Sequence, residues 1–449
     1  MSEGETIYAL SSGAGPAGIA IVRLSGPRAG EVIRRLAGQV PEPRRARLAA
    51  LGQGELIDRA LVLWFPGPDS FTGEDVAEFH LHGGPAVVAA LLAALAEIAG
   101  LRPAGPGEFS RRAFENGKFD LTQAEAIADL VAAETEAQRR QAQIQLGGAL
   151  GRLYEGWRGI LTGALAHFEA AIDFVDEELE VDLQAARREL GQVAGEIAAH
   201  LADRRGERLR QGVSLAIVGP PNAGKSSLLN WLARRDAAIV SASPGTTRDI
   251  IEVQLDLGGW PLSVADTAGL RRAVGDGVEA EGLRRARQRA EGADLRLVVV
   301  EAGEWPEVDA ETAKLLDERS LVLVNKVDLA AVTVRRTPGG APVYAVSVKT
   351  GQGLEEALAA LEARLAAELA PQGLGPAALA SAGASLTRAR HRQSLEVCGQ
   401  ELDRALGQTE VELAAENVRL AGRALGRITG RVDVEDILDL VFAEFCIGK

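Results

Sequence analysis

A glycine-rich loop directly after a buried strand constrains the fold of this chain more than any other feature. The run VSLAIVG, which starts at Val213, is almost entirely apolar, as is typical of a strand covered on both faces of a parallel sheet. The loop, GPPNAGKSS from Gly219 to Ser227, matches the pattern of Gly, four residues and Gly-Lys-Ser. The backbone N–H groups of such a loop surround phosphates. The sequence therefore predicts a P-loop nucleotide-binding domain of the α/β class.

The residues of this loop have separate expected roles. Gly219 and Gly224 let the backbone curl, Lys225 neutralises the β- and γ-phosphates, and Ser226 ligates Mg²⁺. Because of its neutralising charge, Lys225 is also a predicted catalytic residue. The loop residues that we expect to contact the nucleotide are Asn222, Ala223, Gly224, Lys225, Ser226 and Ser227.

Two later motifs select the base. In NKVD, which ends a later buried strand, the Asp328 carboxylate can accept both N–H groups on the Watson–Crick edge of guanine while Asn325 braces the loop. Adenine lacks that donor pair, so GTP is the expected nucleotide; an ordinary strand-to-helix turn is the alternative. SVK would close over the base, although Val348 stands where such GTPases usually have alanine. The predicted base-binding residues are Asn325, Lys326, Asp328, Ser347, Val348 and Lys349.

The motif DTAG supplies a carboxylate that reaches Mg²⁺ through water and a glycine amide for the γ-phosphate. It adds to the GTP-binding set Asp266, Thr267, Ala268 and Gly269. In Ras-like enzymes a glutamine follows and orients the attacking water, but Leu270 stands here and cannot form a side-chain hydrogen bond. The nearby carboxylates that could position the water are Asp276, Glu279 and Glu281. Arg248 is a candidate arginine finger, with an ordinary surface-loop arginine as the alternative.

Changes in composition divide the chain into four segments. Residues 1–118 have short alternating runs between Gly- and Pro-rich turns, which predicts a small α+β domain. Residues 212–370 alternate apolar runs with helical stretches, as in a doubly wound, Ras-like α/β domain. Residues 119–211 and 371–449 are helical, and each has an apolar face that must be buried. We therefore expect these two segments to form one helical bundle into which the α/β domain is inserted.

Two local patterns describe the first helical segment. Thr122 with Glu125 gives a capping-box signal for a helix start, and Asp120 with Gln123 competes for the same role. Apolar residues then recur every three or four positions, which predicts a buried stripe along one long helix. The stripe residues are Leu146, Leu150, Leu153, Trp157, Ile160, Ala164, Phe168 and Ile172.

The net charge of −14 argues against a sequence-independent nucleic-acid coat, since phosphate contacts need clustered cations. Local basic patches that contact RNA are still possible. One candidate begins at Arg111, and a second is a row on one helical face, for which a solvated, ion-paired face is the alternative. The row consists of Arg419, Arg423, Arg427 and Arg431.

No apolar run is long enough to span a membrane, and the start MSEGETIYAL lacks the pattern of a secretion leader. With only two cysteines, Cys398 and Cys446, the chain is expected to be cytoplasmic. Cys446 is fourth from the end, but Gly448 and Lys449 fit a prenylation signal badly. One further pattern allows a transition-metal triad on one strand face, with an ordinary strand face as the simpler alternative. Its residues are Glu78, His80 and His82.

The order of these motifs resembles the MnmE (TrmE) family of tRNA-modification GTPases. The resemblance rests also on PGTTRD, the apolar residue after DTAG, the opening IAIVRLSGP, the segment SFTGEDVAEFHLHGG and the terminal CIGK, and it covers essentially all 449 residues. It implies a potassium-activated GTPase that works with a flavin-dependent partner, MnmG (GidA). Together they would install an aminomethyl or carboxymethylaminomethyl group at carbon 5 of the wobble uridine of certain tRNAs. The one-carbon unit would come from 5-formyltetrahydrofolate or methylenetetrahydrofolate.

The resemblance also assigns roles to particular residues. The N-terminal domain would form a homodimer, in a heterotetramer or larger assembly with MnmG, and bind folate through Arg23, Glu78, Lys118 and Lys449. The positions that match potassium ligands are Asn222, Ser241, Ser243 and Thr246. The magnesium ligands would be Ser226 and Thr247. The switch loop would add to the GTP contacts Ser241, Ala242, Ser243, Pro244, Gly245, Thr246 and Thr247.

Three of these assignments involve departures from the family pattern or open chemistry. Glu279 matches the catalytic, water-positioning glutamate, but the alignment needs one inserted residue. Ser243 and Pro244 differ slightly from the family's loop, although backbone carbonyls there would be unaffected. Cys446 is a possible reactive thiol, since CIGK resembles a tail delivered to the folate pocket.

Two other classes of function remain as alternatives. A ribosome-assembly GTPase switch would share the P-loop, NKVD and Leu270, but it needs neither the folate-like residues nor CIGK. A structural, self-assembling GTPase predicts dimerisation that depends on neither folate nor tRNA.

Overall fold

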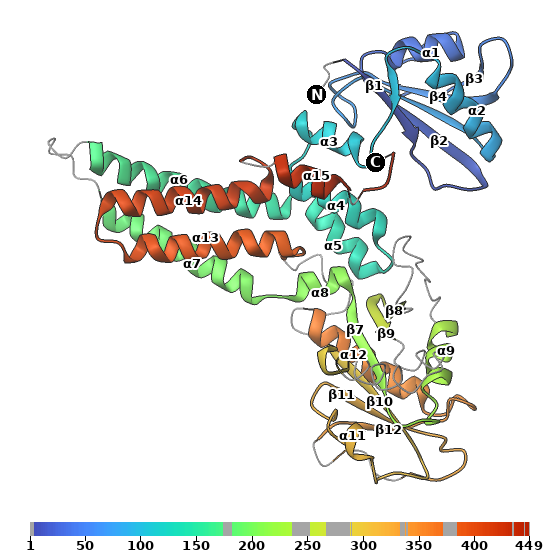
Figure 1. Cartoon of the computed structure of the whole chain (residues 1–449), viewed down its shortest axis with the longest axis vertical. Helices are drawn as coiled ribbons and strands as arrows, with labels where there is room; N and C mark the ends of the chain where they lie inside the picture. Colours follow the sequence, from blue (N-terminus) through green and yellow to red (C-terminus); the bar gives the residue numbers. More distant parts are fainter. Residues whose placement is uncertain are drawn as a thin grey trace, which may run out of the picture. The chain divides into compact units, whose positions relative to one another are not determined.

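The computed structural model describes residues 4–173, 182–235, 252–265, 288, 290–332, 337, 340–370, 384–432, 435–443 and 445–448. By its contacts the multidomain chain divides into two compact units (Figure 1). The first unit comprises Met1–Ala128, Leu146–Gly191 and Gln400–Lys449, and the second comprises Asp129–Gln145 and Gln192–Gly399. This division follows contacts rather than composition, and the four expected segment boundaries stay a prediction.

The N-terminal part of the first unit is a six-stranded sheet with the order β3-β4-β5-β2-β1-β6. Neighbouring strands are antiparallel except β1 and β6, which are parallel. The strands are β1 (Thr6–Leu10), β2 (Ala17–Ser25), β3 (Arg47–Leu51), β4 (Asp58–Phe65), β5 (Val76–Gly83) and β6 (Leu101–Pro103). Helices α1 (Ala29–Ala37) and α2 (Pro85–Ala96) bury their apolar residues against one face of the sheet. This is the predicted α+β arrangement.

Alternation along the strands determines what each face of this sheet carries. On β2, Val22 and Leu24 point into the core with α1 and α2, so Arg23 lies on the opposite face. On β5, Phe79 points into the same core, so Glu78 shares the face of Arg23. The short helix α3 (Glu108–Glu115) follows β6 and buries Phe109 with Ile7 of β1.

The rest of the first unit is helical. Helix α6 (Ala149–Asp173) packs lengthwise against α14 (Val411–Thr429), which comes from the far end of the chain (Figure 1). The remaining helices outside the α/β domain are α4 (Leu121–Ala132), α5 (Glu136–Leu146), α7 (Leu183–Ala202), α8 (Arg205–Gln211), α13 (Ala389–Gly407) and α15 (Glu435–Ala443). Arg187 of α7 donates to the carbonyls of Ala405, Leu406 and Gln408 at the end of α13. Helical residues from both sides of the α/β domain therefore pack together.

The predicted apolar stripe is partly wrong in its membership. Leu146 ends α5 rather than belonging to α6. Four stripe residues are buried on α6, namely Leu150, Trp157, Ala164 and Phe168. Leu153, Ile160 and Ile172 are only partly buried, while Tyr154 and Leu161 take the central positions. The face of α6 that is buried in the packing with α14 therefore differs from the predicted stripe, since Tyr154 and Leu161 replace their neighbours Leu153 and Ile160. Tyr154 can take a central position because its aromatic ring buries well.

The start of α4 decides between the two capping signals. The Asp120 carboxylate accepts from the Gln123 backbone N–H at 2.9 Å, and the Gln123 side-chain oxygen accepts from the Asp120 N–H at 3.1 Å. This reciprocal pair is a capping box. Thr122 and Glu125 lie inside the helix, both buried, so the competing Asp120–Gln123 pair is the correct cap.

The second unit contains a six-stranded sheet with the order β12-β11-β10-β7-β9-β8, parallel except for β8. The strands are β7 (Val213–Val218), β8 (Glu252–Leu257), β9 (Trp260–Ala265), β10 (Leu295–Glu301), β11 (Ser320–Asn325) and β12 (Val343–Ala345). The helices of this domain are α9 (Lys225–Arg235), α11 (Ala310–Ala313) and α12 (Leu354–Leu369). The run VSLAIVG and the run that ends at NKVD, both predicted to be buried strands, are β7 and β11. The loops at the carboxyl ends of β7, β11 and β12 carry the nucleotide motifs, where doubly wound sheets bind ligands.

The start of α5 also belongs to the second unit. Ala137 is fully buried in the core of the α/β domain, together with Leu209 and Trp260. Its backbone N–H donates to the carbonyl of Gly259, in the turn between β8 and β9, at 3.1 Å. A segment that composition assigns to the helical part is therefore packed on the α/β domain.

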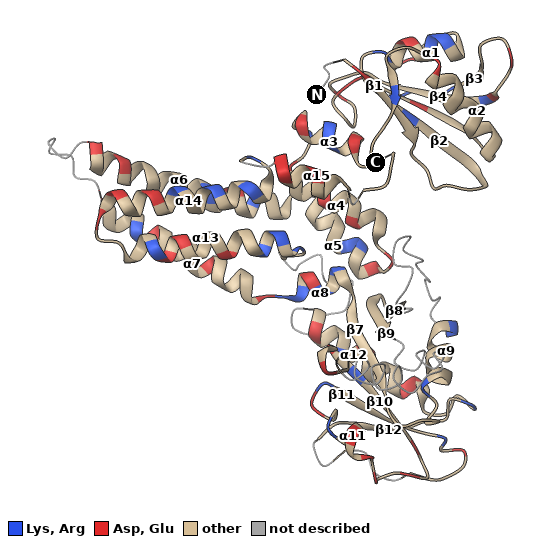
Figure 2. Cartoon of the chain, in the orientation of Figure 1, with Lys and Arg blue, Asp and Glu red and all other residues tan. Residues whose placement is uncertain are grey.

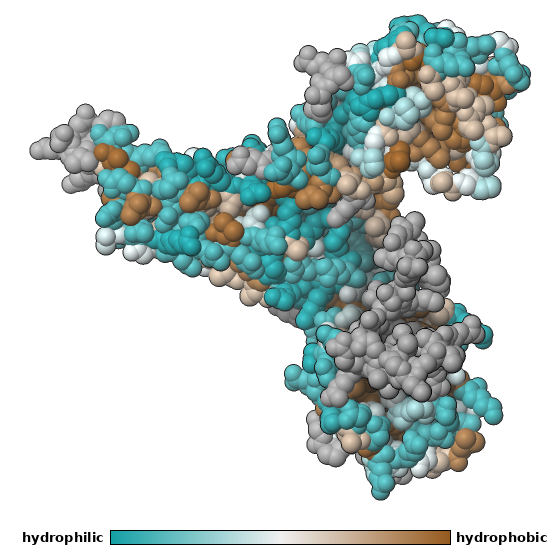
Figure 3. Space-filling view, in the orientation of Figure 1, coloured by the Kyte–Doolittle hydropathy of each residue, from teal (hydrophilic) through white to brown (hydrophobic). Residues whose placement is uncertain are grey.

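Charges on the helical part are largely balanced, as Figure 2 shows for α6 and α14. Of the predicted arginine row, Arg419 pairs with Glu169 at 3.1 Å, and Arg431 pairs with Glu155 at 2.8 Å. This favours the alternative of an ion-paired helix face for at least these two arginines. In the view of Figure 3 the surface of these helices is mostly hydrophilic, with separate apolar spots. Within the described part of the chain, no helix is long and apolar enough to cross a membrane.

Candidate functional site

The P-loop is built so that only glycine fits at two of its positions. Gly219 leaves β7 with a φ of +139°, and a Cβ there would lie 2.0 Å from the carbonyl oxygen of Val299 on β10. Gly224 has a φ of +104°, and its Cβ would lie 2.2 Å from Nδ2 of Asn325. Left-handed backbone and these close approaches both exclude a side chain. The loop is thereby pressed against the ends of β10 and β11.

Lys225 begins α9 and lies against the loop that precedes it. Its Nζ donates to the carbonyls of Gly219 and Pro220 at 2.8 and 2.7 Å. The ammonium group is therefore held beside the loop, where a P-loop lysine meets phosphate oxygens. Ser226 follows in the first turn of α9 and is exposed. Asn222, also exposed, has a φ of +66°.

Asn325 connects the two halves of the nucleotide site. It ends β11 with only 4% of its surface exposed, and its Nδ2 donates to the carbonyl of Ala223 in the P-loop at 2.8 Å. Its Oδ1 accepts from the backbone N–H of Val348 in the SVK loop at 3.1 Å. The bracing contact that the sequence suggested for Asn325 is present, and the same amide also holds the SVK loop.

Asp328 is oriented by the SVK loop. The buried Ser347 hydroxyl donates to Oδ1 of the exposed Asp328 carboxylate at 2.7 Å. Val348, the departure from alanine, is half-buried and packs against the core of the α/β domain. Lys326 has a φ of +67°, and its Nζ pairs with Glu301 at 2.6 Å. The structure thus brings together Asn325, Asp328, Ser347 and the P-loop, with an exposed carboxylate at the rim.

Several predicted site residues lie outside the described residues. They are Ser241, Ala242, Ser243, Pro244, Gly245, Thr246, Thr247, Arg248, Asp266, Thr267, Ala268, Gly269, Asp276, Glu279, Glu281 and Lys449. Their roles remain predictions.

A second polar site lies on the open face of the N-terminal sheet. Arg23 and Glu78 are paired directly across β2 and β5, and Nε and Nη2 of the arginine donate to Oε1 of the glutamate at 3.0 and 2.8 Å. The guanidinium also faces two aromatic rings, with centroids 5.3 Å away for Phe71 and 5.8 Å for Phe109. Sequence reasoning assigned no role to either phenylalanine, although Phe71 stands in the quoted segment SFTGEDVAEFHLHGG.

Glu78 is held as a carboxylate. Burial raises its pKa, but the charge of Arg23 and the hydrogen bonds from His80 and Arg23 outweigh that effect, so the pKa of Glu78 is lowered. His80 Nε2 lies 3.1 Å from Oε2 of Glu78. His82 instead pairs with Asp58 at 2.8 Å. Among the residues that the structure describes, no group of three such side chains could hold a metal ion.

The other folate-matching residue in view is more peripheral. Lys118 is exposed, and its Nζ donates to the carbonyl of Pro68 at 2.8 Å. Arg111, which was the start of a candidate basic patch, pairs with Glu115 at 3.1 Å and with Asp439 at 2.8 Å. Its charge is therefore already balanced by carboxylates.

Known proteins match this chain over almost its whole length. A family model described as the GTP-binding protein TrmE N-terminus matches residues 6–118, and one described as the MnmE helical domain matches residues 121–446. A tRNA modification GTPase MnmE of Paramagnetospirillum magneticum is 56% identical over 450 residues, which cover 99% of this chain and 100% of that protein. The chain belongs to the MnmE family. It is therefore a family member as the sequence motifs predicted, and the prediction of a GTPase that acts in tRNA modification is confirmed.

Relatives outside bacteria and partial structural neighbours also match. A mitochondrial protein of Danio rerio, named 5-taurinomethyluridine-[tRNA] synthase subunit GTPB3, is 47% identical over 474 residues, covering 99% of this chain and 93% of that protein. The G domain of the T. maritima FeoB iron transporter is 25% identical and covers 35% of this chain and 98% of its own, with a TM-score of 0.26. That TM-score is too low to support an inference, so the full-length relatives, and not this structure, bear on function.

Proposed function

We propose that this MnmE family member is a potassium-activated GTPase that works with the flavin-dependent protein MnmG on tRNA. The pair would install an aminomethyl or carboxymethylaminomethyl group at carbon 5 of the wobble uridine, with a folate supplying the one-carbon unit. The name of the Danio rerio relative, which refers to a uridine modified at position 5 in tRNA, supports this choice. For the GTPase part of the proposal, the observation that carries it is the Asn325 amide, which fastens the P-loop to the base-binding loop in one site.

For GTP, the described residues fit the proposed roles. The P-loop offers backbone N–H groups between Gly219 and Ser227, and the nearby Lys225 ammonium would transfer to phosphate oxygens. Asp328 is exposed and fixed in orientation by Ser347, as recognition of the guanine N–H groups requires. Ser226 would ligate Mg²⁺ together with Thr247.

Potassium would supply positive charge near the transferred phosphate, where other GTPases use an arginine finger. Asn222 stands in the P-loop at an exposed position and offers an amide oxygen, a suitable ligand for a hard cation. The further ligands would be Ser241, Ser243 and Thr246, and Glu279 would position the attacking water.

For folate, the open face of the N-terminal sheet has suitable chemistry. The ionised Glu78 can accept N–H donors of a pterin ring, and the exposed Lys118 suits a glutamyl tail, with Lys449 as a second cation. Phe71, which is 37% exposed and has its ring centroid 5.3 Å from the Arg23 guanidinium, offers an apolar face on which a planar ring could stack. The ligand would be 5-formyltetrahydrofolate or methylenetetrahydrofolate.

The same open face supports a homodimer. Ile19, Leu48 and Leu61 are exposed by 64%, 65% and 43%, and they lie on β2, β3 and β4, on the sheet face that carries Arg23 and Glu78. Exposed apolar side chains gathered on one sheet face are typical of an interaction surface. We also propose that both helical segments form one domain around an inserted α/β domain, supported by the packing of α6 on α14. The site of action would be the cytoplasm, in keeping with only two cysteines.

The first test is GTP hydrolysis by the full chain in potassium and in sodium at equal ionic strength. We expect faster turnover in potassium, and we expect Asn222→Ala to remove that preference. Asn230→Ala, an exposed asparagine on α9 of the same domain, is the matched control and should keep it. Equal rates in both salts would refute potassium activation and leave Arg248 or an external activator as the source of positive charge.

A further inference from the structure

The last described residues of the chain are seated on the N-terminal domain. Ile447 forms an antiparallel bridge with Pro106, and the Gly107 N–H points to the carbonyl of Cys446 at 3.5 Å. Cys446 and Ile447 are exposed, whereas Gly448 is buried. The segment Phe445–Gly448, called the tail below, is therefore held by its backbone contacts beyond residue 445 and by the buried side chain of Phe445.

The tip of the tail fits only a glycine. Gly448 has a φ of +98°, and a Cβ there would lie 2.1 Å from the carbonyl oxygen of Leu10 and 3.0 Å from Cα of Ser11. Both of those atoms are backbone, at the end of β1, so they cannot move aside as a flexible side chain could. The preceding residue on β1, Ala9, is the cross-strand partner of Arg23. The tip thus lies one residue along β1 from the position that faces the proposed folate site.

The base of the tail meets a second glycine. Gly107 has a φ of +62°, and a Cβ there would lie 2.7 Å from the carbonyl oxygen of Phe442 and 3.0 Å from Cβ of Phe445. Both phenylalanines are buried, with ring centroids 5.3 Å apart. The α15 backbone can approach this loop so closely only because residue 107 has no side chain.

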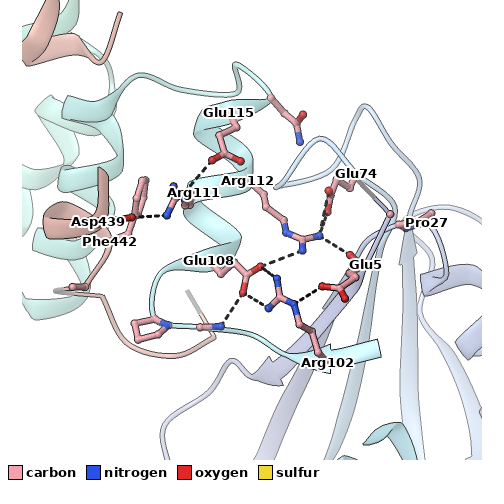
Figure 4. A pocket seen from close by; sticks show the side chains of 15 residues that line it. Glu5, Pro27, Glu74, Arg102, Glu108, Arg111, Arg112, Glu115, Asp439 and Phe442 are labelled. Carbon is pink, nitrogen blue, oxygen red and sulfur yellow. Dashed lines mark hydrogen bonds and ion pairs between the residues drawn. The ribbon is translucent and has the colours of Figure 1, made fainter. Parts of the chain in front are cut away.

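The loop that receives the tail is held by ion pairs in a cavity of about 1010 Å³ (Figure 4). Glu108 accepts from the Gly105 N–H at 2.9 Å and from both terminal nitrogens of Arg102 at 2.8 and 2.6 Å. It also accepts from Arg112 at 3.1 Å. Burial alone would raise the pKa of Glu108. The hydrogen bond from Arg102 and the other contacts have the larger combined effect, so the pKa is lowered and the carboxylate stays charged. These contacts fix residues 105–107 in the position that the tail needs.

The geometry points to Gly107 and Gly448 as positioning residues that seat the tail, and with it Cys446, beside the folate-binding face. This inference rests on the proposed function, since it assigns a purpose to that same site. Neither residue would touch the reacting atoms. Their role is to let two backbones approach closely, so that residues of the C-terminal helical part reach the N-terminal domain in one fixed register.

The test uses the full chain carrying Gly107→Ala or Gly448→Ala, with Gly38→Ala as the matched control. Gly38 also has a positive φ, +77°, but a Cβ there would meet nothing within 4 Å. A fluorophore attached to Cys446 reports tail motion through its anisotropy, and hydrogen exchange of the last residues gives a label-free reading. The left-handed backbone alone disfavours alanine roughly tenfold, and the overlap adds to that. We expect the ratio of seated to released tail to fall at least about tenfold in both tail variants.

The expected result is low anisotropy and fast exchange for Gly107→Ala and Gly448→Ala, and wild-type values for Gly38→Ala. GTP hydrolysis should be unchanged in all of them, while tRNA modification should fall only in the first two. Unchanged anisotropy and exchange in both tail variants would overturn the proposal, and so would an equal loss in Gly38→Ala. Binding of 5-formyltetrahydrofolate by the wild type is measured separately. If the wild type does not bind it, the proposed function fails, while the anisotropy still decides the seating of the tail.

Discussion

Replacing Asn325 by alanine should weaken GTP binding, because its side chain holds the P-loop and the SVK loop together. The variant loses the bond to the Ala223 carbonyl at 2.8 Å and the bond from the Val348 N–H at 3.1 Å. A net value of about 1 kcal/mol for each bond gives a cost of about 2 kcal/mol. If the nucleotide-binding arrangement of the two loops is destabilised by this amount, the Kd for GTP rises roughly 30-fold. Titration with a fluorescent GTP analogue measures it.

The control for this prediction is Asn230→Ala, whose side chain is exposed on α9. It should bind GTP as the wild type does. A Kd for Asn325→Ala within about a factor of three of the wild-type value would refute the reasoning. Such a small change would mean that the Asn325 amide does not hold the two loops in the arrangement that binds GTP.

A double-mutant cycle with Gly224→Ala sharpens the same argument. In the wild-type background the new Cβ would lie 2.2 Å from Nδ2 of Asn325, whereas in Asn325→Ala that atom is absent. The cost of Gly224→Ala should therefore be smaller in the double variant, although the backbone strain at φ +104° remains. Additive costs would contradict the proposed contact.

Three further predictions concern other parts of the chain. Because the folded-state pKa of Glu78 is lowered, its carboxylate stabilises the fold above the ordinary glutamate pKa of about 4.3, and this stabilisation is lost as pH falls through the folded-state pKa. When the free energy of unfolding is measured by denaturant titration at several pH values, Glu78→Gln should therefore lose less stability in acid than the wild type does. Burial raises the pKa of Cys398 to about 12, so a thiol reagent at pH 8 should modify only Cys446 in the folded chain, and both thiols after unfolding. Asp120→Ala should lower stability by about 1 kcal/mol through loss of the α4 cap, seen as a lower Tm, whereas an unchanged Tm would favour a different helix start.

The parts that sequence predicted well are those encoded by neighbouring residues. The P-loop and the strand before it occupy consecutive positions in the chain. The apolar run and the spacing of the glycines therefore suffice to predict the strand and the loop positions of Gly219 and Gly224. The strands of the α/β domain are continuous apolar runs for the same reason. Local signals also came close at α4, where both capping pairs were visible and only the structure shows that Asp120 with Gln123 forms the cap.

The parts that sequence could not place depend on residues far apart in the chain. The Arg23–Glu78 pair forms across a sheet between residues 55 positions apart, and Phe109 reaches it from a helix after β6. On α6, periodicity favoured Leu153 and Ile160, but packing against α14 buried Tyr154 and Leu161 instead. Which face of a helix is buried is decided by its partner, and a single sequence does not contain the register of that contact.

The most direct test of the account as a whole is reconstitution of the modification. Purified chain, the flavin-dependent partner, unmodified tRNA, GTP, Mg²⁺, methylenetetrahydrofolate and ammonium or glycine, as the source of the amine nitrogen, are combined in potassium or in sodium buffer. Mass spectrometry of the tRNA nucleosides then follows the wobble uridine. The account predicts an aminomethyl or carboxymethylaminomethyl uridine that forms in potassium, needs GTP hydrolysis and disappears without the folate. GTP hydrolysis with an unchanged wobble uridine would contradict it and would favour a GTPase switch without folate chemistry.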